Sequence, residues 1–277
     1  QSKNYYPEQY VGQPSAYVGI VGRVTYNYDT KYLFEFNAGY NGSENFAPGK
    51  TRYGFFPAVS AGWILTQEDF MKNQRVFDYL KIRATFGMVG NDNMKKNRYL
   101  YLPSAYTLKK NGYNFGIDTP ENAFRAVEGR IGNPDVTWET AYKQNYGIEA
   151  AFLNNRLKLT FDYFREYRNN ILIQRNTIPA VVSLGSTIVP VVNMGEVRNT
   201  GFEVELRWNH TVGKFNYWIQ PNVSFARNTI LFMDEVEPNE PYMAETGRSI
   251  GMIYGYEAVG FYNDSDFNPD GSLVAGL

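Results

Sequence analysis

The chain contains 277 residues with a formal net charge of −1 at pH 7, so it offers no broad basic surface for nucleic acid. It has no cysteine and a single histidine, His210, which excludes disulfide frameworks, cysteine nucleophiles and multi-histidine zinc sites. Aromatic residues make up 17% of the chain, although the mean hydropathy is −0.44. This combination is typical of a soluble β-sandwich or of a transmembrane β-barrel, and the spacing of apolar residues separates the two.

Apolar and polar residues alternate along eight segments, which predicts eight β-strands with one apolar and one polar face. The first two, residues 17–28 and 32–40, predict a hairpin. The next six are residues 56–65, 79–89, 138–152, 156–167, 201–209 and 215–227, and a ninth, less regular segment is expected at about 250–262. The apolar faces are expected to meet lipid through Val24, Tyr26, Phe34, Phe36, Ile82, Phe161, Val204 and Leu206.

The connections between these segments alternate between short and long. Residues 29–31, 153–155 and 210–214 form short turns, whereas residues 90–137 and 168–200 form the longest predicted loops. Short turns at one end and long loops at the other are typical of an outer-membrane barrel. Aromatic residues at the short-turn ends predict an interfacial girdle of Tyr26, Tyr28, Tyr32, Trp63, Phe152, Trp208, Phe215 and Tyr217.

Five stretches carry a family resemblance. They start at Gly22 (GRVTYNYDTKYLFEFNAGYNGSENFAPGKTRYGFFPAVSAGWILTQEDFMKN), Leu80 (LKIRATFGMVGND), Asn133 (NPDVTWETAYKQNYGIEAAFLNNRLKLTFDYFREYRNNIL), Asn193 (NMGEVRNTGFEVEL) and Gly247 (GRSIGMIYGYEAVGFY). Together and in this order they resemble the barrel of SusC/RagA-like TonB-dependent transporters, the outer-membrane nutrient importers of Bacteroidota. The resemblance covers roughly residues 17–262.

The resemblance implies an all-β fold, an antiparallel up-and-down transmembrane β-barrel of 22 strands around a plug. It also implies a SusD-like surface lipoprotein lid, TonB coupling through an N-terminal region, contact with outer-membrane lipid, and an oligosaccharide or peptide substrate. A homodimer of transporter–lipoprotein pairs is left open. If 22 strands followed one another at the same average spacing as the eight predicted strands within residues 17–227, they would need roughly 580 residues. We therefore expect residues 1–277 to form a single partial barrel domain, without the plug or the remaining strands.

Catalytic chemistry has little support in the sequence, and we expect no enzymatic activity, cofactor or metal. His210 falls in a predicted turn and is expected to be solvated. Residues 266–270 resemble the start of a calcium loop, but Leu277 occupies the position of the bidentate Glu, which favours an acidic surface turn and leaves cation binding open. The charged residues of the strands are expected to face the lumen: Arg23, Glu35, Lys81, Arg83, Asp162, Glu203, Glu205 and Arg207.

Tyrosines in the loop at 90–137 are the predicted substrate-binding residues, because aromatic faces stack on sugars and loops carry function on a rigid scaffold. They are Tyr99, Tyr101, Tyr106 and Tyr113. The alternative is that these rings pack against each other or against a lid protein. Transport is the leading hypothesis, and a small self-contained outer-membrane barrel acting as a structural anchor or adhesin is the alternative. A soluble carbohydrate-binding module is disfavoured, because its outer faces would be polar.

Overall fold

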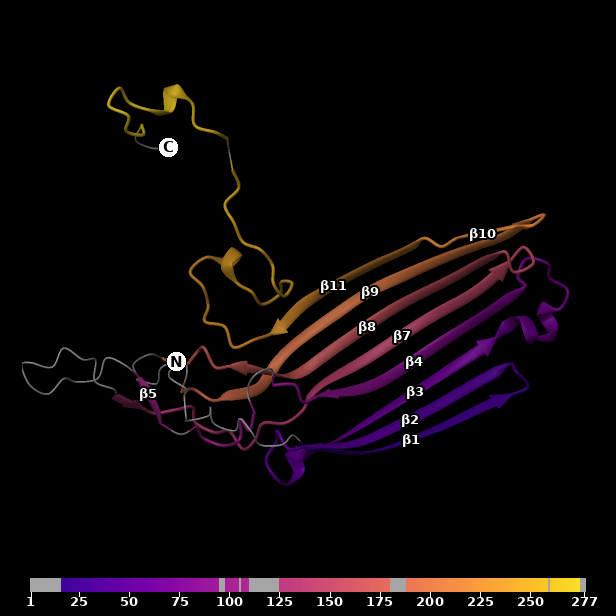
Figure 1. Ribbon diagram of the computed structural model, residues 1–277, viewed down its shortest axis with the longest axis horizontal. Coiled ribbons are helices and arrows are strands. Elements are labelled where there is room, and N and C mark those ends of the chain that lie inside the picture. The colour runs from indigo at the N-terminus through magenta and orange to yellow at the C-terminus, as the bar shows by residue number, and fades with distance from the viewer. Residues whose placement is uncertain are drawn as a thin grey trace, which may run out of the picture.

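A computed structural model describes residues 16–94, 98–104, 106–109, 125–179, 188–258 and 260–274. Its main feature is one 9-stranded antiparallel sheet whose strands follow chain order from β1 to β9, with β10 and β11 both paired to β9 (Figure 1). The strands are β1 (Tyr17–Tyr28), β2 (Tyr32–Ser43), β3 (Tyr53–Ile64), β4 (Tyr79–Asn91), β7 (Glu139–Phe152), β8 (Leu157–Gln174), β9 (Val191–Val212), β10 (Phe215–Ile219) and β11 (Asn222–Phe232).

The remaining elements are short and lie in the connections. Strands β5 (Thr107–Lys109) and β6 (Arg125–Val127) pair with each other as a separate ribbon within the connection between β4 and β7. The 3-10 turns are η1 (Lys50–Arg52), η2 (Leu65–Gln67), η3 (Asp69–Met71), η5 (Pro241–Met243) and η6 (Asp264–Asp266). Among the described residues, no helix has the length and hydropathy to cross a bilayer.

The strand register keeps the two faces of the sheet chemically separate. One row across five neighbouring strands contains Ile82, Ile148, Phe161, Val204 and Val223 and is entirely apolar. The adjacent row contains Arg83, Gly147, Asp162, Glu203 and Ser224. Because side chains alternate along a strand, these rows belong to opposite faces, and a one-residue slip would exchange them. The predicted all-β antiparallel fold is confirmed.

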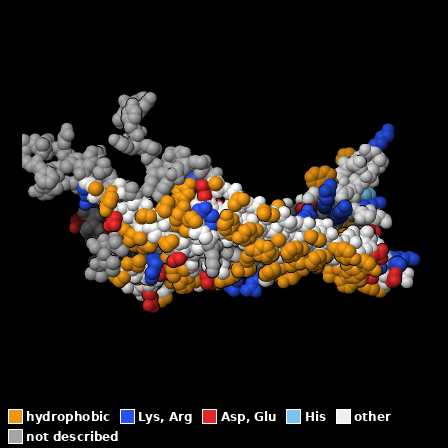
Figure 2. All heavy atoms as spheres, turned by 90° about the horizontal axis from the view of Figure 1, so that it is seen from below, with side chains coloured by type: hydrophobic (Ala, Val, Ile, Leu, Met, Phe, Trp, Pro, Cys, Tyr) orange, Lys and Arg blue, Asp and Glu red, His pale blue; other side chains and the backbone are white. Residues whose placement is uncertain are grey.

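The apolar face is exposed over most of its area. Val24 is 62% exposed and Phe36 is 40% exposed, although they lie directly opposite each other on β1 and β2. Hydrophobic side chains form a belt along the sheet in Figure 2. A contiguous exposed apolar face of this kind marks an interaction surface, and lipid is the solvent that it suits.

The sheet is open in the part of the chain that the structure describes. Strand β1 pairs only with β2, and β11 pairs only with β9. The two edges therefore do not meet, and the described strands do not form a small closed barrel.

Two strands extend much further than the alternation predicts, so the predicted loop at 168–200 is wrong. Strand β8 continues to Gln174 and β9 begins at Val191, which leaves residues 175–190 between them. Asn170 has a φ of 53°, and the register of β8 against β9 shifts between Arg168 and Ile171. This bulge exchanges the faces locally, so the period-2 pattern does not continue through it.

The expected ninth strand at 250–262 is also wrong for the described residues, which form coil there. Tyr256 and Phe261 are fully exposed and no strand pairs with this segment. Apolar alternation without a partner strand does not produce a β-strand.

The predicted strand at 215–227 is interrupted at Pro221, which has no N–H to donate, although its carbonyl accepts from the Leu206 N–H at 3.1 Å.

The buried core lies at the long-loop end of the sheet. Phe46, Met94, Leu100, Val136 and Trp138 are buried together, and Leu172 and Val191 at the facing ends of β8 and β9 pack against them. Nε1 of Trp138 donates to the Arg52 carbonyl at 3.1 Å. The long loops are thus built on a packed base, which the sequence analysis did not anticipate.

The short-turn end carries aromatic side chains tied together by one carboxylate. The Tyr32 and Trp63 rings stack at 6.3 Å, and Trp63 Nε1 donates to Glu68 Oε1 at 3.0 Å. Hydrogen bonds from Tyr32 and Trp63 hold the pKa of the Glu68 carboxyl below its ordinary value. Lys31 Nζ lies 3.7 Å from the same carboxylate. This arrangement is the one expected of an interfacial girdle.

Candidate functional site

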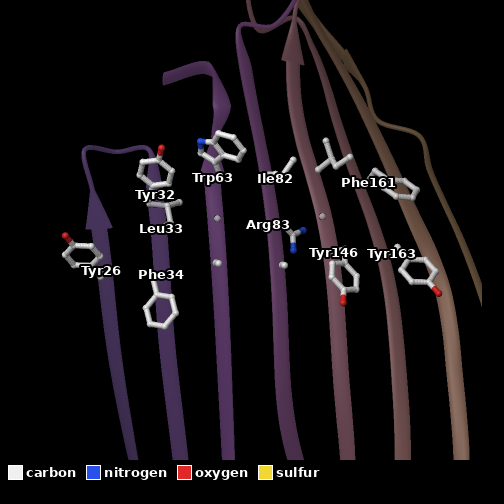
Figure 3. A pocket seen from close by; sticks show the side chains of 15 residues that line it. Tyr26, Tyr32, Leu33, Phe34, Trp63, Ile82, Arg83, Tyr146, Phe161 and Tyr163 are labelled. Atoms are coloured by element: carbon white, nitrogen blue, oxygen red, sulfur yellow. The ribbon is translucent and has the colours of Figure 1, made fainter. Parts of the chain in front are cut away.

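A shallow depression near the short-turn end is mostly apolar (Figure 3). Its volume is about 670 Å³. The small side chains Ala61 and Ala84 occupy adjacent strands here, and larger rings surround them, including Tyr26, Phe34, Trp63, Tyr146, Phe161 and Tyr163. These side chains belong to the apolar rows of the register, so this part of the lining lies on the side that meets lipid, whereas Leu33 and Arg83, which also line the depression, belong to a polar row.

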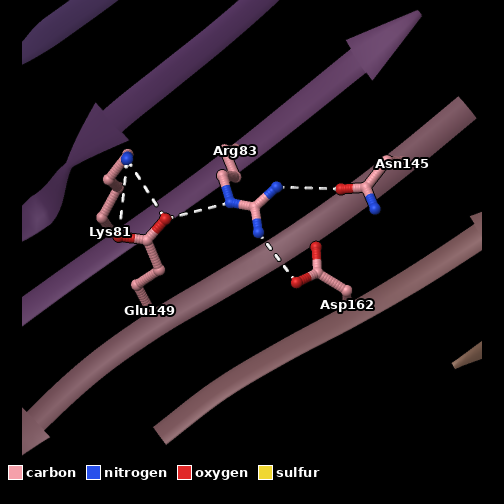
Figure 4. A network of polar contacts seen from close by, with 5 residues as sticks. All are labelled: Lys81, Arg83, Asn145, Glu149 and Asp162. Carbon is pink, nitrogen blue, oxygen red and sulfur yellow. Dashed lines mark hydrogen bonds and ion pairs between the residues drawn. The ribbon is translucent and has the colours of Figure 1, made fainter. Parts of the chain in front are cut away.

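The polar face carries a charged network across β4, β7 and β8 (Figure 4). Glu149 Oε1 lies 3.2 Å from Lys81 Nζ and 3.0 Å from Arg83 Nε. The other edge of the Arg83 guanidinium reaches Asp162 Oδ2 at 2.8 Å and Asn145 Oδ1 at 3.0 Å. The network therefore balances two cations against two carboxylates, and it keeps the face hydrophilic without concentrating one sign of charge.

Gly147 leaves room for the Arg83 side chain in this network. Arg83 crosses the backbone of β7 at this residue, and a Cβ there would lie 2.7 Å from Arg83 Cζ. The sequence alone does not reveal this requirement, because it depends on the register between β4 and β7.

The eight residues predicted to face the lumen all lie on the polar face by register. Arg23 Nη2 and Glu35 Oε2 form an ion pair at 2.6 Å between β1 and β2. Arg207 Nε donates to Asn209 Oδ1 at 3.1 Å. Glu203 and Glu205 are exposed, and neither makes an ion pair with a residue that the structure describes.

The predicted substrate-binding tyrosines differ in their surroundings. Tyr99 is 7% exposed, its hydroxyl accepts from Arg98 Nη2 at 2.9 Å, and burial raises its pKa. The Tyr99 and Tyr101 rings meet edge to face at 6.1 Å. Tyr106 is 72% exposed, and Tyr113 lies outside the described residues. Among the described members of this predicted set, Tyr106 thus presents the most ring surface to a ligand.

Two polar side chains, the buried Asp234 and the half-buried Asn193, tie the long connections together at their bases. Asp234 accepts the N–H groups of Asn176 at 2.6 Å and Thr177 at 3.0 Å. These bonds, with that of the Thr177 hydroxyl, hold the pKa of Asp234 below its ordinary value. The Asn193 side chain accepts from the Thr137 N–H at 2.9 Å and donates to the Asn170 carbonyl at 2.7 Å. Sequence reasoning missed both residues, since an isolated Asp or Asn gives no signal of its distant partner.

His210 lies within β9 and not in a turn, which corrects the prediction. Strand β9 runs to Val212 because the hairpin turn is tighter than expected, with Gly213 at a φ of 61°. The ring of His210 lies 5.7 Å from that of Tyr217 and 6.1 Å from that of Trp208.

The acidic segment at 266–270 forms local turns. Asp266 Oδ2 accepts the Asn263 N–H at 2.7 Å, and Asp270 Oδ1 accepts the Ser272 hydroxyl at 2.6 Å. Within the described ranges, no three His, Cys, Asp or Glu side chains converge in a way that could hold a metal ion.

An antiparallel meander with one lipid-facing side and one charged side defines a transmembrane β-barrel protein. The model of the family described as "TonB dependent receptor-like, beta-barrel" matches residues 2–272, and the chain belongs to this family. The resemblance found in the sequence is therefore confirmed, as is the location in the outer membrane.

Individual relatives agree with the family match. TonB-dependent receptor P3 of Formosa agariphila is 29% identical over 95% of this chain and 27% of its own length. TonB-dependent receptor SusC of Bacteroides thetaiotaomicron is 28% identical over 88% of this chain and 24% of its own length. The "closed-closed" structure of the RagAB peptide importer matches 84% of this chain and 25% of that chain, with a TM-score of 0.67 and 23% identity. The chain thus spans about a quarter of the length of these relatives.

Proposed function

We propose that this chain forms part of the barrel wall of an outer-membrane active transporter, and that the whole protein imports oligosaccharides or peptides. The polar face of the open sheet carries this proposal. A barrel of about eight strands has an interior just wide enough for side chains to fill it. Here the edges stay apart, and the charges on the polar face are paired along the wall, as between Arg83 and Asp162. That arrangement suits a wide lumen and disfavours a self-contained anchor or adhesin.

A SusD-like surface lipoprotein is the proposed partner at the long-loop end, and TonB is the proposed source of energy through a region outside this chain. The packed base around Phe46 and Trp138 supports the first part, because it gives the loops a rigid platform on which a lid could close. The similarity to SusC supports both the lipoprotein partner and the coupling to TonB. Outer-membrane lipid covers the apolar face.

Tyr106 and Tyr101 are the proposed substrate contacts among the described tyrosines, and Tyr113 remains a proposal from the sequence. The exposed ring of Tyr106 is available to stack on a sugar ring or on a peptide side chain. Tyr99 is proposed to act indirectly, since its ring packs against Tyr101 and orients it.

Replacing Tyr106 by Ala in the full-length protein is expected to lower the affinity for the imported solute about 2- to 12-fold, which corresponds to roughly 0.5–1.5 kcal/mol for one aromatic contact. The matched control is Tyr106→Phe, which keeps the ring and should keep most of the affinity. The measurement is uptake of labelled oligosaccharides and peptides by cells that carry equal surface amounts of each variant.

Two outcomes would contradict these proposals separately. Unchanged uptake by Tyr106→Ala would remove this residue from the substrate site but would leave transport standing. Equal uptake of every candidate solute by cells with and without the full-length protein would contradict transport itself.

A further inference from the structure

The lipid-facing side of the sheet carries three arginines toward its long-loop end. Arg165 of β8, Thr200 of β9 and Arg227 of β11 lie directly opposite one another, and Arg198 lies on β9 two residues nearer the long loops. The register is unbroken from these positions to the lipid-facing Val204. The three arginines, here called the arginine cluster, therefore belong to the apolar face and not to the face assigned to the lumen.

The arginine cluster lies at the outer edge of the apolar band. Arg165 follows Leu157 by eight residues, and Leu157 is directly opposite Trp208 of the short-turn girdle. At about 3.3 Å per residue and a strand tilt of about 40°, Arg165 lies on the order of 20 Å above that girdle, close to the full height of an apolar band. Figure 3 shows the hydroxyls of Tyr146 and Tyr163, one row nearer the midplane, directed away from the short turns. The arginine side chains can thus extend to the headgroups.

The arginine cluster has no carboxylate partner among the described residues. All three side chains are exposed, and none forms an ion pair within the described part of the chain. The nearest acidic residue along this face of β9 is Glu196, which interacts with the Tyr167 hydroxyl. Neighbouring strands lie about 4.8 Å apart, so the backbones of Arg165 and Arg227 are roughly 10 Å apart. Their side chains can therefore converge on one anionic group near Thr200.

Positive charge is not a general feature of this edge of the apolar face. Toward the long-loop ends of β1, β2 and β3, the residues that lie directly opposite one another on the lipid-facing side are Ile20, Tyr40 and Phe55. The basic side chains are therefore concentrated on β8, β9 and β11.

An exposed apolar surface adjoins the arginine cluster on its midplane side. Tyr163, Phe202 and Phe225 form the next lipid-facing row on the same three strands, and the rings of Phe202 and Phe225 stack at 5.9 Å. Phe225 is 57% exposed. A ligand that matches both layers has an anionic head and apolar chains, whereas a free inorganic anion would leave these rings uncovered.

We propose that the arginine cluster binds the phosphate of a phosphorylated lipid in the leaflet at the long-loop end, and that Phe202 and Phe225 contact its acyl chains. Arginine matches phosphate oxygens with two parallel hydrogen bonds, and the Thr200 hydroxyl can donate another. The depth of the cluster and its unpaired charge complement such a headgroup. The proposal rests on the outer-membrane location and not on the proposed transport function.

Binding of purified diphosphorylated lipid A to the full-length protein in detergent, followed by native mass spectrometry, tests this assignment. Arg165→Gln and Arg227→Gln are each expected to lower the affinity about tenfold, because a charge-assisted contact to phosphate is lost. Arg165→Lys keeps the charge but loses the two-pronged geometry, so its affinity should fall less. The matched control is Arg168→Gln, which lies near the same height of β8 but faces the lumen, where Arg168 is paired with Glu166. Its affinity should equal that of the unmodified protein.

Dephosphorylated lipid A and inorganic phosphate complete the design. The dephosphorylated lipid should bind at least about tenfold more weakly, and inorganic phosphate at equal concentration should leave the phosphorylated lipid bound. Equal affinity of Arg165→Gln and Arg168→Gln for diphosphorylated lipid A would overturn the site. Equal binding of the two lipids would overturn phosphate as the recognised group, and displacement by inorganic phosphate at equal concentration would overturn a lipid as the ligand.

Discussion

Replacing Phe36 by Arg is expected to destabilise the folded, inserted full-length protein by about 2–4 kcal/mol, the cost of a basic side chain on the lipid face near the bilayer midplane. Phe36 follows Tyr32 of the girdle by four residues, which places it on the order of 13 Å deeper along β2. Its partners across the sheet are Val24 and Val59, so an Arg there finds no polar neighbour in its own row. Reversible unfolding in lipid vesicles measures the change.

Thr25→Arg is the matched control for this substitution. Thr25 is exposed on the polar face and lies directly opposite Glu35, which can accept the new charge. We expect a change within about 0.5 kcal/mol, as is usual for an exposed polar site. Equal losses for Phe36→Arg and Thr25→Arg would contradict the assignment of the two faces.

Replacing Trp138 by Ala is expected to destabilise the long-loop end by about 3–5 kcal/mol, because a buried ring leaves a cavity that its neighbours cannot fill. Trp138 is 5% exposed, and its ring lies 5.1 Å from that of Phe46 and 5.2 Å from that of Phe56. The substitution also leaves the Arg52 carbonyl without its indole donor. Hydrogen exchange of the amides at 133–138 measures the free energy of local opening.

Trp138→Phe separates packing from hydrogen bonding. It keeps most of the ring volume and loses the indole N–H, so we expect a smaller loss of about 1–3 kcal/mol. If Trp138→Ala changed the opening free energy by less than 1 kcal/mol, the loops would not be anchored on this core.

The membrane-spanning parts of the strands could be predicted from the sequence because two different solvents act on them. Along β1 and β4, lipid selects apolar side chains on one face and the lumen selects polar ones on the other, which imposes a strict period of two. The predicted ranges 17–28 and 79–89 therefore agree with these strands within two residues.

The parts beyond the bilayer could not be predicted in the same way. At the long-loop ends of β8 and β9, side chains such as Leu172 and Val191 pack on the buried core around Trp138. The polarity of a residue there no longer indicates which face of the sheet it lies on. The bulge at Asn170 then shifts the phase of the alternation. The segment at 250–262 shows the converse case, where apolar residues alternate but no strand lies beside them.

The candidate functional site could be predicted from the sequence only in part, and the reason is related. Charges on the polar face could be assigned from their spacing, but their pairing could not, because Arg83 meets Asp162 across an intervening strand. The positions of Asp234 and Asn193 likewise depend on contacts between segments far apart in the chain. Alternation predicts which way a strand residue points, and it carries no information about which loop residue it meets.

Spin labels attached to cysteines introduced one at a time at residues 33–38 of β2 test the central claim most directly, in a full-length protein whose only cysteine is the introduced one; residues 1–277 themselves contain none. The measurement compares the collision of each label with oxygen, which concentrates in lipid, and with a water-soluble nickel complex. The two-faced barrel wall predicts alternation with a period of two, with labels at positions 34, 36 and 38 favouring oxygen. Uniform accessibility along the segment, or alternation with the opposite phase, would contradict it.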